Sequence, residues 1–477
     1  MNLLKQIESQ RETSSVEKTM FINSDYTPEN LVINKHTNPK RVIYGLSGIV
    51  NTMNTCYMNS AIQAFSHNYL LTNFLFNKKE EILKTLKKNA RKILKDEAAF
   101  KLDSIQNIIP MELRKKIQDE RYSPEMLTEE ETTIVYNSTI TAQLIRMLER
   151  MWLDNCTVIP TSFRKVFSEA RNKFFFGYHQ HDAEEAYSCI LQKMQEELAE
   201  EKNIKFKTNN NSVQDFLKYK NEISKEIYNT TDDLEKMRLY NKYKETKAKY
   251  PMESLTIEAF REMKKYYGSS YSGITEIFSG FLHSSMNCPN IDCGHSSNKF
   301  EPFLHLSLEI PTSKSNSTIY ECLNEYCKQE ILDENNLWLC ERCNNKVKGI
   351  KKLQLWTAPP FLVVQFKRFG IARVTKNHSH IDFPMNNFDI SSYISPARFD
   401  KNDCYKYKLQ CVINHQGTMN SGHYFTYCLN EDTNEWFKFD DSHVTRIAYA
   451  SGIISSSAYL LFYMREDFIR TDISENK

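Results

Sequence analysis

The segment from Asn51 to Phe65 constrains this chain more than any other, because it joins a polar turn, a cysteine and a helix start. The polar run ends at Thr55, and apolar residues then recur at helical spacing, at Met58, Ile62, Phe65 and Tyr69. This pattern predicts that Cys56 lies in the first turn of a helix packed on a core. The positive end of a helix dipole favours a thiolate over a thiol. The alternative is a small buried cysteine near a helix start, a common place for a free thiol.

Length and composition allow a large folded protein and indicate no strongly charged partner. The chain has 477 residues, of which 40% are hydrophobic and 26% charged, and its formal net charge is +2. Neither nucleic acid nor a membrane is favoured as a partner. We find no apolar run near the roughly 18 residues of a membrane span and no signal-peptide pattern in the first residues. We therefore expect an intracellular protein, cytoplasmic or nuclear. Among its 12 cysteines, those at short spacing indicate metal ligands or catalysts rather than disulfides.

Periodicity divides the chain into a helical first half and a β-rich second half. Residues 1–40 are polar and aperiodic, which predicts a flexible extension. Helical patterns dominate residues 41–200, and residues 201–265 predict a mobile, charged and mostly helical insertion. Short β-type runs prevail over residues 270–467, and residues 468–477 are expected to be a tail.

Two aromatic runs around a polar turn near the C-terminus predict a hairpin that brings a histidine to an aspartate. If Leu429 pairs with Trp436, His423 becomes a diagonal neighbour of Asp440 on one face of the sheet. The carboxylate then fixes the tautomer of the imidazole, and the pair supplies the base that Cys56 needs to act as a nucleophile. The alternative is a surface hairpin with an incidental histidine.

Four cysteines form two close pairs, Cys288 with Cys293 and Cys340 with Cys343. Two such pairs can supply four thiolates to tetrahedral zinc. The second pair has the usual gap of two residues, whereas the first has a gap of four. We predict a structural zinc ion; the alternative is a lobe held by packing alone.

These features together resemble the ubiquitin-specific proteases. Residues 48–60 resemble the cysteine box of that family, and residues 421–424 with 439–441 resemble its histidine box. Residues 180–183 are similar to an element between the boxes, and residues 363–369 to a strand before the histidine box.

The resemblance extends over roughly residues 42–466 and implies one catalytic domain over 41–467. The implied fold is α+β and papain-like, with a helical thumb, a β-rich palm and zinc-ribbon-type fingers that grip ubiquitin. The implied activity is that of a deubiquitinase, a thiol-dependent isopeptidase that cuts after the C-terminal Gly-Gly of ubiquitin on lysine side chains or in ubiquitin chains. Ubiquitin and ubiquitinated proteins would be its partners, and catalysis would need no cofactor.

The resemblance also implies a role for each catalytic side chain. Cys56 would be the nucleophile, His423 the base and then the acid, and Asp440 the residue that orients the histidine, with Asp441 as its stand-in or support. Asn51 falls where the family places its oxyanion-stabilising side chain, a contribution on the order of 3 kcal/mol.

For ubiquitin recognition the resemblance implies a separate set of side chains. Asp182 and Glu185 would meet the arginine-bearing tail of ubiquitin, since arginine forms charge-assisted forks with carboxylates. His415 and Tyr424 would border a channel that admits only Gly-Gly. The whole implied set is Gln180, His181, Asp182, Glu185, His415 and Tyr424. Considered without the resemblance, the alternative is that the cluster at residues 180–185 is simply a well-charged helix start.

Two departures from the family pattern leave alternatives open. The family has glycine three residues before the nucleophile, where this chain has Met53. If that position requires a positive φ, methionine costs about 1–2 kcal/mol of strain or moves the loop. One alternative is therefore a catalytically weak or inactive ubiquitin-binding module. Ala186 and Tyr187 replace the family's Phe-Leu, which motivates another alternative, a protease for a ubiquitin-like modifier.

Overall fold

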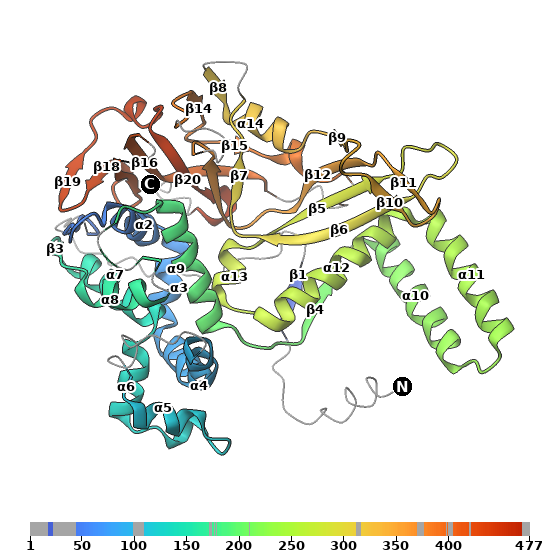
Figure 1. Cartoon of the computed structure of the whole chain (residues 1–477), viewed down its shortest axis with the longest axis horizontal. Coiled ribbons are helices and arrows are strands. Elements are labelled where there is room, and N and C mark those ends of the chain that lie inside the picture. The colour runs from blue at the N-terminus through green and yellow to red at the C-terminus, as the bar shows by residue number, and fades with distance from the viewer. Residues whose placement is uncertain are drawn as a thin grey trace, which may run out of the picture.

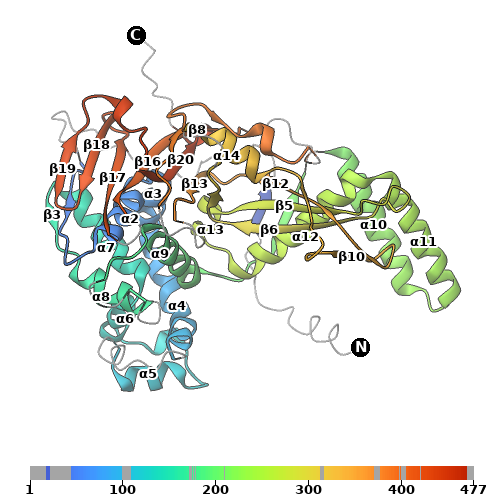
Figure 2. The same ribbon diagram turned by 45° about the horizontal axis from the view of Figure 1, so that its top comes forward.

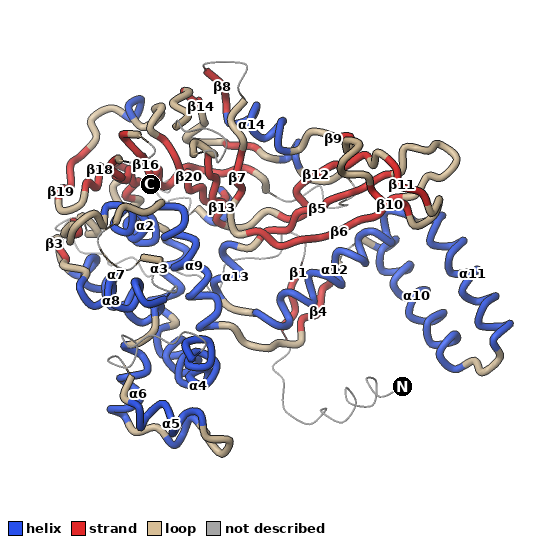
Figure 3. Tube along the Cα trace, viewed as in Figure 1, coloured by secondary structure: helices blue, strands red, loops and turns tan. Residues whose placement is uncertain are grey.

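A computed structural model provides the structure, and the residues it describes are 18–21, 44–98, 109–170, 174–175, 177, 179–208, 210–311, 316–369, 376–396, 398, 404–418 and 421–469. A helical lobe lies at one end of the molecule, a large sheet lies beside it, and a longer, narrower sheet leads to a pair of helices at the other end (Figure 1). Colouring by secondary structure separates the helical lobe from the two sheets (Figure 3).

The helical lobe is built around α2, whose residues are buried along its whole length. One side of α2 packs on the large sheet and another on α9, where Phe65 stacks on Tyr187 with ring centroids 4.4 Å apart. The helices of this lobe are α2 (Cys56–Ser66), α3 (Tyr69–Asn77), α4 (Lys79–Ala98), α5 (Met111–Gln118), η2 (Pro124–Met126), α6 (Glu129–Asn137), α7 (Ile140–Leu153), α8 (Thr161–Ala170) and α9 (Ala183–Leu198). A short parallel pair, β2 (Gly48–Ile49) with β3 (Thr157–Val158), ties the segment before α2 to this lobe.

Local sequence explains where several of these helices begin. The side chain of Thr128 and that of Glu131 form a capping box at the start of α6. Glu197 is buried and accepts hydrogen bonds from the backbone amides of Ile140 and Thr141, both at 2.8 Å, at the first turn of α7. A buried carboxylate is stable there because it meets the unpaired amides of a helix N-terminus.

The large sheet has the strand order β19-β18-β17-β16-β20-β13-β7, with β15 paired to β16. Its strands are β7 (Leu306–Leu308), β13 (Phe361–Phe366), β15 (Phe388–Asp389), β16 (Lys406–Gly417), β17 (Gly422–Asn430), β18 (Glu435–Asp440), β19 (His443–Arg446) and β20 (Ala458–Arg465). Leu429 pairs with Trp436 across β17 and β18. The register expected from the two aromatic runs is therefore the one that the chain adopts.

The narrow sheet has the order β6-β5-β12-β9 and leads away from the large sheet. Its strands are β5 (Gly280–Asn287), β6 (Ser296–Phe303), β9 (Glu330–Ile331) and β12 (Ile350–Thr357). A small hairpin, β10 (Trp338–Cys340) with β11 (Asn345–Val347), lies at its far end (Figure 1). The remaining elements are α13 (Gly273–Phe278), α14 (Ile319–Tyr326), β8 (Asn316–Thr318) paired with β14 (His380–Asp382), η3 (Ser391–Tyr393), η4 (Ala450–Gly452) and η5 (Glu466–Phe468).

The charged insertion is helical, as expected, but its last helix belongs to the core of the narrow sheet. It comprises α10 (Asn211–Asn229), α11 (Asp233–Lys249) and α12 (Pro251–Ser270). In α12, Met263 and Tyr267 are buried against Phe281 and Trp356. The expected boundary at residue 265 therefore falls inside a packed helix.

The expected N-terminal extension contains a strand. β1 (Lys18–Phe21) pairs in parallel with β4 (Ile204–Lys207), so these four residues are not the aperiodic segment that their composition predicts. The rest of residues 1–40, and residues 470–477 of the expected tail, lie outside the described part. No helix in the described ranges has the length and apolarity needed to cross a membrane.

Candidate active site

Cys56 is the first residue of α2, as the helical spacing predicts, and only 3% of its surface is exposed. The side chain of Thr55 makes no capping bond to the helix; its hydroxyl instead accepts the amide of Thr52 at 3.0 Å. The unpaired amides at the start of α2 are therefore left for other acceptors. An anion that forms beside Cys56 meets them directly.

His423 lies between Cys56 and Asp440. Its Nε2 is 2.6 Å from Oδ1 of Asp440. The interaction of the ring with the side chain of Cys56, and then that with Asp440, outweigh burial and raise the pKa of His423 to about 9. The imidazole can thus hold a proton beside the sulfur at neutral pH.

Lys438 holds the other oxygen of Asp440. Its Nζ is 2.7 Å from Asp440 Oδ2 and 4.4 Å from the ring centroid of Phe425. Burial acts in the opposite direction, but Lys438 and His423 keep the pKa of Asp440 below its ordinary value. The sequence reasoning did not single out Lys438. The sequence signal that could have identified Lys438 is its position two residues before Asp440, because residues at that spacing lie on the same face of a strand.

Asp441 makes contacts different from those of Asp440, because its carboxylate binds the loop before Cys56 and the helix α2. Its Oδ2 accepts from Nδ2 of Asn51 at 2.9 Å, and its Oδ1 accepts from Nδ2 of Asn59 at 2.8 Å. Its own carbonyl accepts the amide of Ile49 at 2.8 Å. The backbone of Asp441 has φ 51°, in the left-handed region that Asp tolerates better than most residues.

The side chain of Asn51 forms hydrogen bonds through both its oxygen and its nitrogen. Oδ1 of Asn51 accepts the backbone amide of Thr55 at 3.0 Å, while its Nδ2 donates to Asp441. An amide nitrogen carries two hydrogens, so the second hydrogen of Nδ2 is left to meet a substrate. Arg164 adds a further tie, since its Nη1 donates to the carbonyl of Thr52 at 2.7 Å.

Met53 adopts φ 68°, followed by Asn54 at φ 56°. The position therefore has the positive φ for which glycine is the usual residue, and the methionine side chain is 62% exposed. Of the two outcomes considered for this position, strain and displacement, the chain adopts the strained backbone. The bonds of Asn51 to Thr55 and Asp441 keep the loop in place.

Gln180 and His181 lie at the entrance to α9, close to the strand that carries His423. Oε1 of Gln180 accepts the backbone amide of Gly422 at 3.2 Å. The ring of His181 lies edge-on to Tyr57 at 5.2 Å, and burial lowers the pKa of this histidine. These contacts link the start of α9 to β17, which carries His423, and to α2, which carries Cys56.

Asp182 caps α9 and is engaged from the large sheet. Its Oδ1 accepts the amide of Glu184 at 2.7 Å, and the hydroxyl of Tyr459 lies 2.8 Å from both carboxylate oxygens. Burial raises the pKa of Asp182 to about 6. Tyr459 in turn accepts from Gln365 at 2.9 Å. Sequence reasoning missed Tyr459, which is far from Asp182 along the chain. Glu185, in the first turn of α9, is exposed.

His415 and Tyr424 face each other across β16 and β17, with ring centroids 4.5 Å apart. Both are buried. Burial, with Lys376 nearby, lowers the pKa of His415 to about 4, so this ring is neutral. A Cβ at Gly422 would lie 2.1 Å from Nε2 of His415, which leaves only glycine room there.

The four paired cysteines converge at the far end of the narrow sheet. All four sulfur atoms lie within 4.8 Å of one another, with Cys288 to Cys343 at 3.7 Å and Cys293 to Cys340 at 3.6 Å. A tetrahedral ion with metal–sulfur bonds of about 2.3 Å requires sulfur–sulfur edges of about 3.8 Å. The cluster can therefore hold a metal ion, and the longer gap in the first pair does not prevent it.

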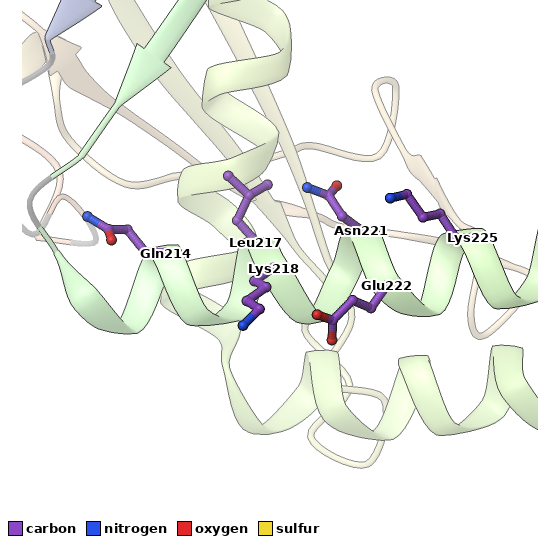
Figure 4. Close-up of a pocket in the computed structure, with 6 residues that line it drawn as sticks. All are labelled: Gln214, Leu217, Lys218, Asn221, Glu222 and Lys225. Atoms are coloured by element: carbon purple, nitrogen blue, oxygen red, sulfur yellow. The ribbon is translucent and has the colours of Figure 1, made fainter.

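A separate shallow cavity of about 370 Å³ lies along α10 (Figure 4). It is lined by Gln214, Leu217, Lys218, Asn221, Glu222 and Lys225. This lining contains no thiol or imidazole, and α10 is at the opposite end of the molecule from α2 (Figure 1). The cavity takes no part in the chemistry around Cys56.

The geometry around Cys56 can be compared with known proteins. The family model described as ubiquitin carboxyl-terminal hydrolase matches residues 47–463. The chain belongs to this family. Within it, the chain is 53% identical over 442 residues to the probable ubiquitin carboxyl-terminal hydrolase R319 of Acanthamoeba polyphaga mimivirus, covering 92% of this chain and 94% of that protein. Membership makes the protein a cysteine-type deubiquitinase, as the two boxes imply.

More distant members of the ubiquitin carboxyl-terminal hydrolase family support the same fold. Usp2 of Drosophila melanogaster is 26% identical over 422 residues, which cover 88% of this chain and 35% of that protein. A solved structure, that of the SAGA Ubp8/Sgf11/Sus1/Sgf73 DUB module bound to ubiquitin aldehyde, contains a chain with a TM-score of 0.54 and 22% identity. The likeness covers 89% of this chain and 70% of that one. The predicted α+β fold of thumb, palm and fingers is confirmed.

Proposed function

We propose that this protein is an isopeptidase that hydrolyses the bond after the C-terminal Gly-Gly of ubiquitin, on lysine side chains of proteins or within ubiquitin chains. The observation that carries the proposal is the contact series from Cys56 through His423 to Asp440 at the start of a buried helix. We assign Cys56 as the nucleophile, His423 as the base and acid, and Asp440 as the residue that orients His423.

In the first half of the reaction, the sulfur of Cys56 attacks the carbonyl carbon of the terminal glycine. Negative charge then develops on the carbonyl oxygen, which lies near the second hydrogen of Asn51 Nδ2 and the first amides of α2. His423 gives its proton to the leaving lysine amine, and a thioester remains on Cys56.

In the second half, water attacks the thioester. His423, now neutral, takes a proton from the water, and Nε2 stays bound to Asp440 so that the ring keeps its orientation. The carboxyl group of ubiquitin and the thiolate of Cys56 are released. No cofactor takes part in either half.

We assign the recognition of the ubiquitin tail to the start of α9 and the β16–β17 hairpin. With a pKa of about 6, Asp182 is mostly ionised at neutral pH and can accept an arginine of the tail together with the exposed Glu185. The uncharged rings of His415 and Tyr424 provide an aromatic wall that does not repel that arginine. The close contact at Gly422 supports a narrow passage beside this wall.

The deciding experiment is hydrolysis of a fluorogenic ubiquitin substrate by the purified protein, set beside the same fluorophore on ubiquitin-like modifiers. We expect turnover of the ubiquitin substrate alone. Binding of ubiquitin without turnover would favour an inactive binding module. Faster hydrolysis of another modifier would favour a protease for a ubiquitin-like modifier, the alternative that Ala186 and Tyr187 motivate.

The pH dependence of kcat/KM should reveal the raised pKa of His423. The protonated imidazole is needed for the leaving amine, and its pKa of about 9 predicts that activity falls as pH rises through about 9. Asp440→Asn removes a carboxylate that raises this pKa, so the alkaline limb should move to lower pH. Asp441→Asn is the matched control and should move the limb less. An unmoved limb in Asp440→Asn would separate Asp440 from His423.

Replacing Met53 with glycine should stabilise the protein with little effect on turnover. Glycine removes the strain of a positive φ but loses more entropy on folding, so the net gain should be about 0.5–1 kcal/mol. Because Asn51 is anchored by Thr55 and Asp441, kcat should change by less than about threefold. Thermal unfolding and fluorogenic turnover measure both, with Met53→Ala as the control that keeps the strain. A large rise in kcat would instead mean that methionine misplaces Asn51.

We propose that zinc occupies the four-cysteine cluster and stabilises the fingers. The purified protein should then contain about one zinc per chain, and Cys293→Ser should lose it. The cluster is remote from α2 (Figure 1), so KM for ubiquitin should rise about tenfold or more while kcat changes less. Cys404→Ser is the control and should keep both zinc and KM. Metal-free protein with full activity would refute the assignment.

A further inference from the structure

The helices α10 and α11 form an arm that projects beyond the narrow sheet, and two views place it at the end of the molecule away from α2 (Figures 1 and 2). The arm is attached through α10, where Val213 and Phe216 pack on Ile257 of α12. α11 packs on α10 and on α12. Its inner side carries Tyr243 and Thr246, and the hydroxyl of Thr246 is 3.1 Å from that of Tyr219.

Three large apolar side chains of α11 are exposed among its polar residues. Leu234 is 80% exposed, Met237 65% and Tyr240 53%, and none of the residues of α11 is buried. A spacing of three residues keeps these side chains within roughly 120° of the helix circumference. Tyr228, 79% exposed, lies near the end of α10 that leads into α11. We call these four side chains the arm patch.

An uncovered patch of this kind is unusual for a helix on the surface of a folded protein. Such helices normally turn their large apolar side chains inward, and contiguous exposed apolar side chains mark interaction sites. The inner side of α11 already supplies the contact with α10 through Tyr243, so folding of the arm does not require the arm patch. The side chains of the arm patch are therefore available to contact a partner.

The charges on α11 indicate what kind of partner would bind the arm patch. α11 has six Lys or Arg residues against three Asp or Glu residues, a net charge of +3. Two of these cations are engaged within the helix, Lys236 with Asp233 at 3.8 Å and Arg238 with Glu235 at 3.6 Å. In the described part of the chain Lys242, Lys244 and Lys249 form no ion pair, and Lys244 Nζ lies 5.7 Å from the ring centroid of Tyr240. The cations without an ion pair thus lie in the C-terminal half of α11, after Tyr240, whereas Asp233 and Glu235 flank Leu234 in its first turn.

We propose that the arm patch docks an acidic amphipathic helix of a substrate or scaffold protein. Apolar residues at three- and four-residue spacing in that helix would pack between Leu234, Met237 and Tyr240, and its carboxylates would meet Lys242, Lys244 and Lys249. A second copy of α11 fits less well, because two helices of net charge +3 would repel each other. Nucleic acid would engage the lysines but leave Leu234 and Met237 against phosphates.

The test is selection from a displayed library of random 16-residue peptides on the full-length protein, after depletion on a variant combining Leu234→Ser, Met237→Ser and Tyr240→Ser. We expect enrichment of acidic peptides with apolar residues at helical spacing. A synthetic enriched peptide should bind the variant about tenfold or more weakly, because three apolar contacts are lost. A second variant combining Lys242→Glu, Lys244→Glu and Lys249→Glu should weaken it similarly, and it leaves the arm patch intact.

Matched controls keep the interpretation specific to the arm. Met111→Ser combined with Met126→Ser removes two other exposed apolar side chains and should bind the peptide normally. Both arm variants should keep turnover of fluorogenic ubiquitin within about twofold, since the arm is remote from Cys56. The proposal is overturned if no peptide is enriched in an arm-dependent way or if the enriched peptides are basic. It is also overturned if a 20-base-pair DNA duplex competes with the peptide for binding, or if sedimentation shows a dimer that the serine variant abolishes.

Discussion

Alanine in place of Cys56 should abolish hydrolysis of ubiquitin substrates, and alanine in place of His423 should lower kcat by at least about a thousandfold. The reason is that sulfur and imidazole act as one unit. Without the base, the thiol does not attack and the leaving amine stays unprotonated. A ubiquitin probe with a C-terminal electrophile should label Cys56 and no other cysteine, which intact-mass spectrometry can check.

The other cysteines give this prediction its control. Cys156→Ala changes a partly exposed thiol outside the site and should leave both labelling and turnover intact. Ubiquitin affinity of Cys56→Ala, measured by calorimetry, should stay close to that of the wild type, since the sulfur contributes chemistry rather than tail binding. Labelling that persists in Cys56→Ala would overturn the assignment of the nucleophile.

Asn51→Ala should lower kcat by about a hundred- to a thousandfold with little change in KM, because the lost hydrogen bond exists only in the transition state. Asp441→Ala should lower kcat almost as far. The carboxylate of Asp441 accepts from Nδ2 of Asn51 at 2.9 Å and from Nδ2 of Asn59 at 2.8 Å. We therefore expect Asp441 to act as a positioning residue through Asn51 rather than on the substrate.

A double-mutant cycle separates positioning from an independent role. If Asp441 works through Asn51, the double variant Asn51→Ala with Asp441→Ala should be no slower than Asn51→Ala alone. The alkaline limb of the pH profile should stay in place in Asp441→Ala, whereas it moves in Asp440→Asn. If the losses in kcat from the two substitutions add, Asp441 has a role independent of Asn51. If Asp441→Ala is inactive while Asp440→Ala is active, Asp441 orients His423 instead of Asp440.

Local sequence was sufficient for the parts of this protein that depend on neighbouring residues. Helical spacing after Thr55 placed Cys56 at a helix start, and the first residue of α2 is Cys56. A two-residue alternation and a polar turn placed His423 diagonal to Asp440, because the register of a hairpin follows from its turn. The spacing within the cysteine pairs indicated the cluster for a similar reason, since each pair is a local turn.

Only the tertiary structure decided how distant segments share these groups. Asp441 contacts Asn51 from 390 positions away, and Tyr459 reaches Asp182 across the sheet. No periodicity in a single sequence records such contacts, because they depend on how the sheet packs on the helical lobe. The same holds for α12, whose charged composition predicted a mobile insertion although one face is buried in the fingers. Spacing along the chain therefore specified the reactive groups, while packing between lobes specified their orientation and the surroundings that set their pKa values.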